Sequence, residues 1–217
     1  MRNQQLIEDL RYRLQNTHGT PVNVGLNHHL PDIFETKSRQ QAAVLIPIIR
    51  TKERLSVFFT QRSPHISDPM RWCFPGGRLE EQDRKDLVKT ALREGQEEAG
   101  IPIKQLDILG TLMPCHDRRN SMITPVVAVL DGPFTPVLSP NEVMDTTEIP
   151  LNDILNRDNH TINRWDNAEH PFRCHHFHHA AQPNTINIYG ITGGILNYFR
   201  HFTNKETGPL DWSAEVA

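Results

Sequence analysis

Apolar residues recur along the first third of the chain with two different spacings. Between residues 4 and 15 they follow the three-to-four-residue spacing of a helix with one apolar face. These residues are Leu6, Ile7, Leu10 and Leu14. The continuous apolar runs at 42–49 and 55–60 instead predict buried strands, and the polar residues between them predict a hairpin turn. Pro47 indicates an edge or a bulge in the first strand because it lacks a backbone N–H, and Thr17–Pro31 predicts a loop.

The rest of the chain alternates strand and helix patterns. Strands are predicted at 72–74, 106–112, 123–130, 172–179 and 186–189. Helices are predicted at about 86–99, 151–155 and 193–202. Gly100 is well placed to end the first of these helices, and Gln182–Asn184 predicts the turn of a hairpin between the last two strands. Elements of this length predict an α/β (α+β) domain with helices on both faces of a sheet.

Composition and charge limit the classes of protein. The 217 residues are 37% hydrophobic and 23% charged, which fits one globular domain. A net charge of −3 gives no overall basic field for nucleic acid. Cys73, Cys115 and Cys174 form neither a disulfide framework nor a CxxC zinc pair, and no apolar run approaches the roughly 20 residues of a membrane span. We therefore expect a soluble cytoplasmic protein without a nucleic-acid or membrane partner.

Three glutamates gather on the helix predicted at 86–99. At about 100° per residue, Glu94, Glu97 and Glu98 lie within roughly a third of the helix circumference. Carboxylates this close repel one another unless a cation neutralises them, and hard oxygen ligands suit Mg²⁺ or Mn²⁺. The alternative is a solvated acidic face. Because Arg93 and a preceding Gly76–Gly77 turn accompany the glutamates, a metal site is the better interpretation.

At this point the segment 77–101 resembles the Nudix box, Gly-x5-Glu-x7-Arg-Glu-aliphatic-x-Glu-Glu-x-Gly-aliphatic. The residues that match are Gly77, Arg93, Glu94, Glu97, Glu98, Gly100 and Ile101. The loop between Gly77 and Arg93 carries two extra residues, and Gly95 stands at the aliphatic position. Counted back from Arg93, the first glutamate of the box falls on Lys85. The nearby acids that offer a substitute are Glu80, Glu81 and Asp83.

The resemblance implies a fold, a chemistry and a set of site residues. The fold is an α/β/α sandwich around a mixed β-sheet, in which the box forms a loop, a helix and a loop. The chemistry is attack of water on one phosphorus of a diphosphate linkage, with Mg²⁺ or Mn²⁺ on Glu94, Glu97, Glu98 and the Gly77 carbonyl, and with a carboxylate taking the proton. Arg93 would orient the glutamates; its alternative is a simple surface ion pair.

Resemblance to the coenzyme A diphosphatase branch of this family extends over about residues 42–200. The segments that carry it are 58–63, 74–77, 123–127, 140–143 and 188–195. The implied substrate is coenzyme A or a derivative, cleaved to adenosine 3′,5′-bisphosphate and a 4′-phosphopantetheine derivative. The expected organisation is an N-terminal helix and loop extension at 1–40, a Nudix hydrolase domain at 41–203 and a C-terminal tail at 204–217. The two flanking segments either cover the pocket, mediate a homodimer or trim the fold.

Several candidate residues lie outside the box. Arg62 and Arg71 are the best local counter-charges for an anionic substrate, and Phe74 of the Phe-Pro-Gly-Gly run is a further substrate contact. The branch places an arginine and a glycine where this chain has Ser67 and Arg71, so the match is incomplete there. Ordinary exposed arginines are the alternative.

A proton acceptor or additional metal ligand is also expected outside the box. The resemblance favours Glu142, with Asp145 and Glu148 as alternatives in the same predicted loop, and a solvated loop acid is the other interpretation. In the histidine-rich run 174–179, Cys174, His176 and His178 would share one face of a strand as three metal ligands, although a half-buried hairpin is the better interpretation. Tyr189 is interpreted as a packing residue.

The sequence is also compatible with two other functions. One keeps the chemistry but changes the substrate to ADP-ribose, a dinucleotide or a damaged nucleotide, because the region of Ser67 and Arg71 departs from the coenzyme A pattern. The other is a non-catalytic Nudix domain that binds a nucleotide or a protein, suggested by the longer loop, Lys85 and Gly95. All three metal-binding glutamates are present, which favours an enzyme.

Overall fold

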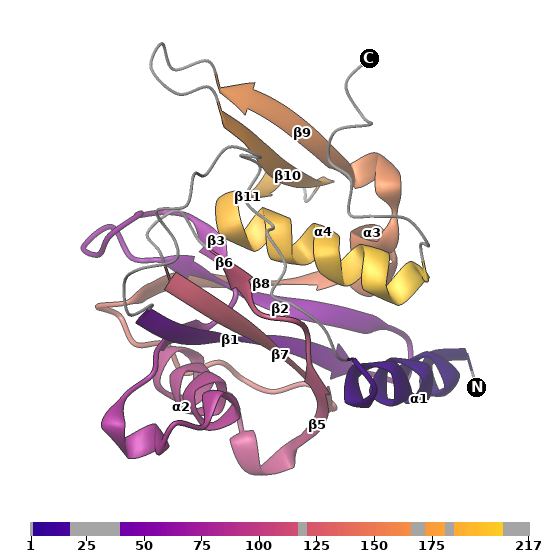
Figure 1. Ribbon diagram of the computed structural model, residues 1–217, viewed down its shortest axis with the longest axis horizontal. Helices are drawn as coiled ribbons and strands as arrows, with labels where there is room; N and C mark the ends of the chain where they lie inside the picture. Colours follow the sequence, from indigo (N-terminus) through magenta and orange to yellow (C-terminus); the bar gives the residue numbers. More distant parts are fainter. Residues whose placement is uncertain (1, 18–39, 117–120, 166–171, 181–184, 206–217) are drawn as a thin grey trace.

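Helices lie on both faces of a mixed β-sheet in the computed structural model, which describes residues 2–17, 40–116, 121–165, 172–180 and 185–205 (Figure 1). The main sheet contains β1 (Gln40–Arg50), β2 (Leu55–Arg62), β3 (Trp72–Cys73), β4 (Gly76–Arg78), β5 (Leu106–Thr111), β6 (Cys115–His116), β7 (Ser121–Asp131) and β8 (Val143–Pro150). A second sheet contains β9 (His160–Trp165), β10 (Phe172–Ala180) and β11 (Thr185–Tyr189). The helices are α1 (Arg2–Gln15), α2 (Leu87–Ala99), α3 (Leu151–Leu155) and α4 (Gly190–Asn204).

Strand β1 is the centre of the main sheet. The order is β3-β2-β1-β7-β5, with β8 added beside β2, β4 beside β1 and β6 beside β7. β1 and β7 run parallel over their whole length, from Gln40 opposite Ser121 to Arg50 opposite Asp131, whereas the other neighbouring strands described in this sheet pair antiparallel. The sheet is therefore mixed, as predicted.

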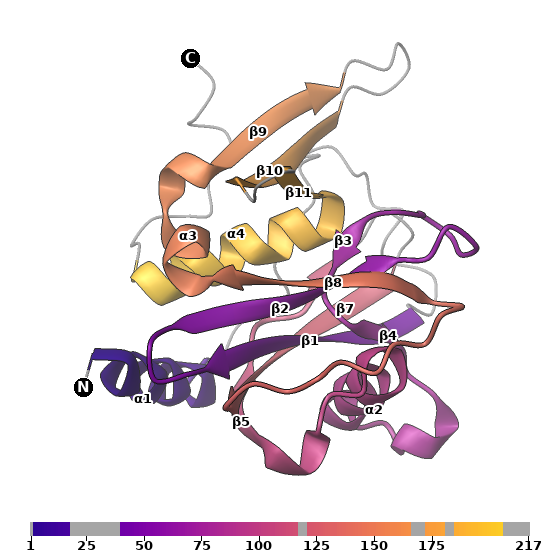
Figure 2. The ribbon, with the colours of Figure 1, turned by 180° about the vertical axis from the view of Figure 1, so that it is seen from behind.

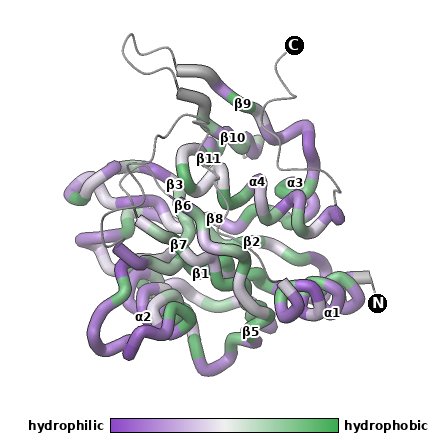
Figure 3. The backbone as a smooth tube through the Cα atoms, viewed as in Figure 1, coloured by the Kyte–Doolittle hydropathy of each residue, from purple (hydrophilic) through white to green (hydrophobic). Residues whose placement is uncertain are grey.

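Each face of the main sheet has its own hydrophobic core. On one face α2 packs through Ala91 and Ala99 onto Leu45 and Phe58 of the sheet. On the other face α1, α3 and α4 share a larger core with the strands. The second sheet then covers α4 on its outer side (Figures 1 and 2). Figure 3 shows the hydrophobic residues concentrated in the central strands and the hydrophilic ones in the loop before α2. The α/β/α sandwich is confirmed.

The predicted opening helix is confirmed as α1, and its apolar face lies in the core. Ile7, Leu10 and Leu14 are between 1% and 4% exposed. A Cβ added to Gly110 of β5 would lie 2.8 Å from the Leu14 Cβ, so the helix and strand are in close contact. The N-terminal segment therefore contributes a helix to the core of the domain.

The prediction that Pro47 marks an edge strand or a bulge is wrong, because β1 is an interior strand with β2 and β4 on one side and β7 on the other. On one side of β1, residues 42–44 pair with β4 and residues 48–50 pair with β2, so Pro47 falls in the interval between the two ladders. N–H direction alternates along a strand, and the Leu45 N–H on that side donates to the Pro75 carbonyl at 2.8 Å. Pro47 would direct its N–H to the same side, but at this position β1 pairs with neither β4 nor β2 in the described structure. The missing N–H of proline therefore costs no hydrogen bond between strands.

Four strands were missed from the sequence, namely the short strands β4 and β6 and the longer strands β8 and β9. Residues 143–150, predicted as loop, form β8, and residues 160–165 form β9. In β8 only Val143 and Ile149 are buried, so its hydropathy does not alternate as a half-buried strand should. The helix predicted at 151–155 has those bounds, and α4 begins three residues before its predicted start. The loop prediction beyond Thr17 and the turn prediction at 182–184 lie outside the described residues.

Candidate active site

Helix α2 is fixed at both ends and packed tightly on the sheet. The Asp86 side chain accepts hydrogen bonds from the Val88 and Lys89 amides at 3.0 and 3.3 Å, and Gly100 ends the helix with a φ of 66°. A Cβ on Gly95 would lie 2.9 Å from the Leu45 Cδ2 of β1. The small residue at the aliphatic position of the box therefore lets the helix approach β1 closely.

Two carboxylates of α2 lie against the glycine turn of β4. A Cβ on Gly77 would lie 2.2 Å from Glu94 Oε1, so only glycine leaves room for that carboxylate. One turn further along the helix, Glu98 accepts a hydrogen bond from the Gly76 amide. Figure 2 shows β4 directly beside α2. The fold thus brings together Glu94, Glu98 and Gly77, as the sequence predicted.

The environment of this carboxylate pair disfavours two negative charges. Burial and then the charge of Glu94 raise the pKa of Glu98 to about 8; the Gly76 hydrogen bond opposes them, and Glu142 and Arg62 have smaller effects in opposite directions. Burial also raises the pKa of Glu94, against the effect of Arg93. Glu98 Oε2 is buried and has no hydrogen-bond partner in the described structure. A divalent cation fits here, because it would satisfy that oxygen and neutralise both acids.

Glu97 points differently from its two neighbours. Its Oε2 accepts a hydrogen bond from Arg93 Nη1 at 2.9 Å, and its side chain is 53% exposed. Within the described ranges, no three His, Cys, Asp or Glu side chains already surround one point as metal ligands do. The three predicted carboxylate ligands are therefore neighbours on one helix, of which two face the glycine turn.

Arg93 is the centre of a network of ion pairs and not a surface pair. Its side chain is 13% exposed and its Nη1 contacts Glu94 Oε1 at 3.0 Å as well as Glu97. Its Nε and Nη2 donate to the two carboxylate oxygens of Asp83 at 3.0 and 3.1 Å, and Nη2 also donates to the Arg78 carbonyl. This guanidinium holds the pKa of Asp83 at about 2 and itself has a raised pKa, chiefly through Asp83.

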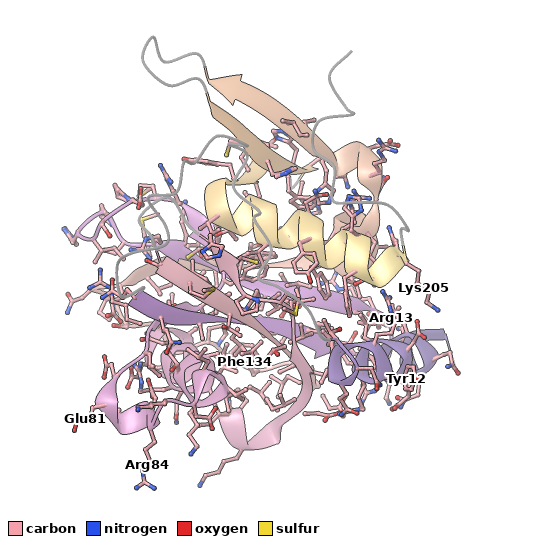
Figure 4. All side chains as sticks on the ribbon, in the orientation of Figure 1. Tyr12, Arg13, Glu81, Arg84, Phe134 and Lys205 are labelled. Atoms are coloured by element: carbon pink, nitrogen blue, oxygen red, sulfur yellow. The ribbon has the colours of Figure 1, made fainter. Side chains whose placement is uncertain are left out.

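Asp83, and not Lys85, takes the position of the first glutamate of the Nudix box pattern. Counted forward from Gly77, the box pattern reaches Asp83, so the two extra residues follow it. They are Arg84 and Lys85, both in left-handed conformation with φ of 54° and 64°. Figure 4 shows the Arg84 side chain pointing away from the body of the protein. The insertion is thus a bulge at the surface that leaves the network with Arg93 intact.

Arg62 lies at the end of β2, close to the acids. Its charge lowers the pKa of Glu98, while its Nε donates to the Ser67 carbonyl at 2.9 Å. Arg71 lies opposite Arg62 in the hairpin that joins β2 and β3, because the Arg62 amide donates to the Arg71 carbonyl at 2.9 Å. The Arg71 side chain turns to Asp68, 3.3 Å away, and to the ring of Tyr189. The two predicted arginines therefore face different parts of the molecule.

Phe74 belongs to the hydrophobic core. Its side chain is 3% exposed and stacks on Phe59 with ring centroids 4.9 Å apart. Almost none of its surface is available to a substrate. The buried ring instead anchors the chain just before the glycine turn.

Among the three candidate acids outside the box, Glu142 lies nearest to the carboxylate pair electrostatically. Its charge raises the pKa of both Glu94 and Glu98. Its backbone is fixed, because its carbonyl accepts from the Ser63 amide at 2.8 Å and its own amide donates to Ser139. By contrast, Glu148 accepts from Ser56 Oγ at 2.6 Å and Asp145 accepts from the next backbone amide.

The histidine-rich strand β10 is part of the second sheet. The Cys174 Sγ accepts a hydrogen bond from the Gly190 amide at 3.0 Å. His176 stacks on Tyr189 and on His178 with centroid distances of 5.3 and 5.9 Å. Across the ranges that the structure covers, no metal-ligand cluster includes these side chains. The alternative of a zinc or nickel site here has no support in the geometry.

Comparison with known proteins agrees with this arrangement. The NUDIX domain model matches residues 39–169. The mouse peroxisomal coenzyme A diphosphatase NUDT7 is 30% identical over 88% of this chain and 77% of its own length. A Nudix hydrolase NudL of Enterobacter, whose name describes it as uncharacterized, is 32% identical over 73% of this chain and 80% of its own.

Other matches cover less of the molecule. A NudL protein of Citrobacter koseri is 37% identical over 56% of this chain, and the match spans 62% of that relative's length. A C. elegans Ap4A hydrolase structure has a TM-score of 0.45 and 25% identity over 54% of this chain and 83% of that chain. No helix in the described part of the chain is long and apolar enough to span a membrane. By its family model and its relatives, this chain is a member of the Nudix hydrolases, enzymes that act on phosphorus anhydrides.

Proposed function

We propose that this chain hydrolyses the diphosphate linkage of coenzyme A or a coenzyme A derivative, giving adenosine 3′,5′-bisphosphate and a 4′-phosphopantetheine derivative. The chemistry is supported by one observation above all: Glu98 Oε2, beside Glu94 and the Gly76–Gly77 turn, is buried and has no hydrogen-bond partner among the residues that the structure describes. The substrate is supported by the similarity to the mouse coenzyme A diphosphatase, which extends over 88% of this chain.

In this proposal Mg²⁺ or Mn²⁺ is held by Glu94, Glu97, Glu98 and the Gly77 carbonyl. When bound, the ion polarises phosphoryl oxygens and lowers the pKa of water. The protein supplies the arrangement of the ligands. Arg93 holds Glu94 and Glu97 in place from one side, and Asp83 holds Arg93 from the other. Glu97 and Glu94 contact the same Arg93 nitrogen, at 2.9 and 3.0 Å, so a rotation of the exposed Glu97 side chain would let it join the ligand set.

Hydrolysis forms one P–O bond to water and breaks the P–O bond of the bridging oxygen. We assign Glu142 as the acceptor of the water proton, because it is exposed and yet close enough to shift the pKa of both helix acids. The charge of Arg62 lowers the pKa of Glu98, and this arginine would counter the charge of the phosphoryl oxygens.

A second candidate substrate is ADP-ribose, a dinucleotide or a damaged nucleotide. The observation in its favour is the segment between Arg62 and Phe74, where Arg62 donates to the Ser67 carbonyl and Ser67 stands in place of the arginine of the coenzyme A pattern. The test is a panel of these diphosphates and coenzyme A, each incubated with Mg²⁺ or Mn²⁺ and read by product mass. Fastest cleavage of coenzyme A or a thioester of it supports the first proposal, and fastest cleavage of another compound overturns it. Binding without any product would identify a non-catalytic domain.

A further inference from the structure

A row of side chains on the second sheet leads to Arg71. The ring of Tyr189 stacks on the ring of His176, with centroids 5.3 Å apart and planes 12° from parallel. His176 in turn stacks on His178, at 5.9 Å and 23°. The guanidinium carbon of Arg71 lies over Tyr189, 5.0 Å from the ring centroid. Arg71, Tyr189, His176 and His178 thus form a continuous stack, which we call the Arg71 row.

The far end of the Arg71 row is fixed by hydrogen bonds. His178 Nδ1 contacts Asn187 Oδ1 at 2.6 Å, and its Nε2 contacts Thr161 Oγ1 at 3.1 Å. The register of β10 and β11 places His176 opposite Tyr189, so strand pairing sets the stack. Burial, with a smaller effect from His178, lowers the pKa of His176, which favours the neutral form of the ring that stacks on Tyr189.

The junction between β11 and α4 also fixes Tyr189. Gly190, the first residue of α4, has a φ of 71°, and its amide donates to the Cys174 Sγ at 3.0 Å. A Cβ on Gly190 would lie 3.8 Å from Arg71 Nη1, which places the guanidinium directly beside this junction. In Figure 1, β11 lies next to β3, and α4 starts from its end. The backbone around Tyr189 therefore has little freedom to move away from Arg71.

Arg71 lies opposite Arg62 in the hairpin of β2 and β3, and its side chain contacts Asp68 and Tyr189. Its carbonyl accepts from the Arg62 amide, and Arg62 is the arginine whose charge reaches Glu98. The Arg71 side chain is 42% exposed, and its Nη1 contacts the Asp68 carboxylate at 3.3 Å. Its remaining donors can therefore meet an anion that lies beyond the diphosphate being cleaved.

We propose that Tyr189, supported by His176, is a positioning residue that holds Arg71 to contact a phosphate group of the substrate outside the cleaved diphosphate. This inference rests on the proposed function, because coenzyme A carries such a phosphate ester and dephospho-coenzyme A does not. An arginine that is already placed loses less freedom on binding, so loss of the ring weakens binding without changing the reacting groups. A partly exposed cation–π contact is worth about a two- to fivefold change in affinity.

The test is a kinetic double-mutant cycle on the full chain with coenzyme A and dephospho-coenzyme A. Tyr189→Leu and Arg71→Leu each raise KM for coenzyme A about two- to fivefold, leave kcat within twofold and leave dephospho-coenzyme A unaffected. The double variant is no worse than Arg71→Leu, because Tyr189 acts through Arg71. Tyr189→Phe keeps the ring and behaves as the wild type. Tyr12→Leu, at a tyrosine that is 70% exposed on α1, is the matched control and changes nothing (Figure 4).

Several results would overturn the positioning role. These are equal losses on the two substrates, full additivity in the double variant, or a Tyr189→Phe variant as impaired as Tyr189→Leu. If Tyr189→Leu does not fold, Arg71→Leu still tests the phosphate contact, because it removes a partly exposed side chain. Equal losses of activity on both substrates would refute that contact. If the wild type cleaves neither compound, the proposed function fails, and the ratio of their dissociation constants in wild type and Arg71→Leu, measured by calorimetry, tests the phosphate contact separately.

Discussion

Asp83 offers a direct test of the network that holds the glutamates of α2. Asp83→Asn removes the carboxylate that binds Arg93 through two hydrogen bonds. Among the residues with described positions, the guanidinium, which is 13% exposed, then keeps Glu94, Glu97 and Glu80 as acidic contacts. In the wild type, Asp83 Oδ2 also accepts hydrogen bonds from the Thr90 hydroxyl and the Glu80 amide. The substitution replaces one carboxylate oxygen by an amide nitrogen, which cannot accept a hydrogen bond. Both effects destabilise the loop that leads from Gly77 to α2.

The pKa of Asp83 sets the magnitude. Its fall from 3.8 to about 2 corresponds to about 2 kcal/mol of stabilisation by the charged form. The network lies near the surface, where water weakens ion pairs, so we expect Asp83→Asn to lower the free energy of unfolding by about 1–2 kcal/mol at pH 7. Because the folded pKa lies below the unfolded one, this stabilisation is complete above about pH 4. It is lost as the pH falls through about 2.

Urea unfolding of wild type and Asp83→Asn at pH 7, 4 and 2.5 measures this difference. Glu81→Gln is the matched control, because Glu81 lies in the same short helix with an exposed side chain that points outward (Figure 4). We expect the gap between wild type and Asp83→Asn to narrow below pH 4 and the control to show no gap. A difference below about 0.5 kcal/mol at pH 7, or one that stays constant with pH, would refute the role given to Asp83.

Three further changes test the rest of the site. Gly77→Ala would place a Cβ 2.2 Å from Glu94 Oε1, so kcat should fall about 100-fold with little change in melting temperature, and unchanged kcat would show that Glu94 is not held there. Gly100→Ala should cost about 1–2 kcal/mol in urea unfolding, more than Gly132→Ala, because both positions have positive φ but only Gly100 has a neighbour within 4 Å. Saturating Mg²⁺ should raise the melting temperature by roughly 5–10 °C in the wild type and by little in Glu94→Gln, and equal rises would place the ion elsewhere.

The chemistry of α2 was predictable because it lies in one short segment. The spacing of Glu94 and Glu98 fixes their common face, and Gly77 precedes them by one loop. The loop itself was not predictable. Lys85 would lie beside Arg93 if the two extra residues came before it, and Asp83 pairs with Arg93 if they come after Asp83. The structure shows the second case, because Arg84 and Lys85 adopt left-handed conformations that place them in a bulge.

Contacts across the fold could not be read from the chain at all. Phe74 looks like part of a substrate motif until its packing on Phe59 is seen, and the strand β8 has too few buried residues to show a pattern. Likewise, the stack of Arg71 on Tyr189 joins residues more than 100 positions apart. Local patterns predicted the elements, whereas the partners of exposed charged and aromatic residues depend on how those elements pack.

The most direct measurement is product analysis by mass spectrometry for wild type and Glu98→Gln, each with coenzyme A and Mg²⁺. The substitution keeps the size of the side chain and removes the charge beside Glu94 and the Gly76 amide. We predict adenosine 3′,5′-bisphosphate and 4′-phosphopantetheine from the wild type and a rate at least about 100-fold lower from the folded variant. Equal rates from the two proteins would contradict the assignment of the partly buried pair Glu94 and Glu98 as the hydrolytic centre.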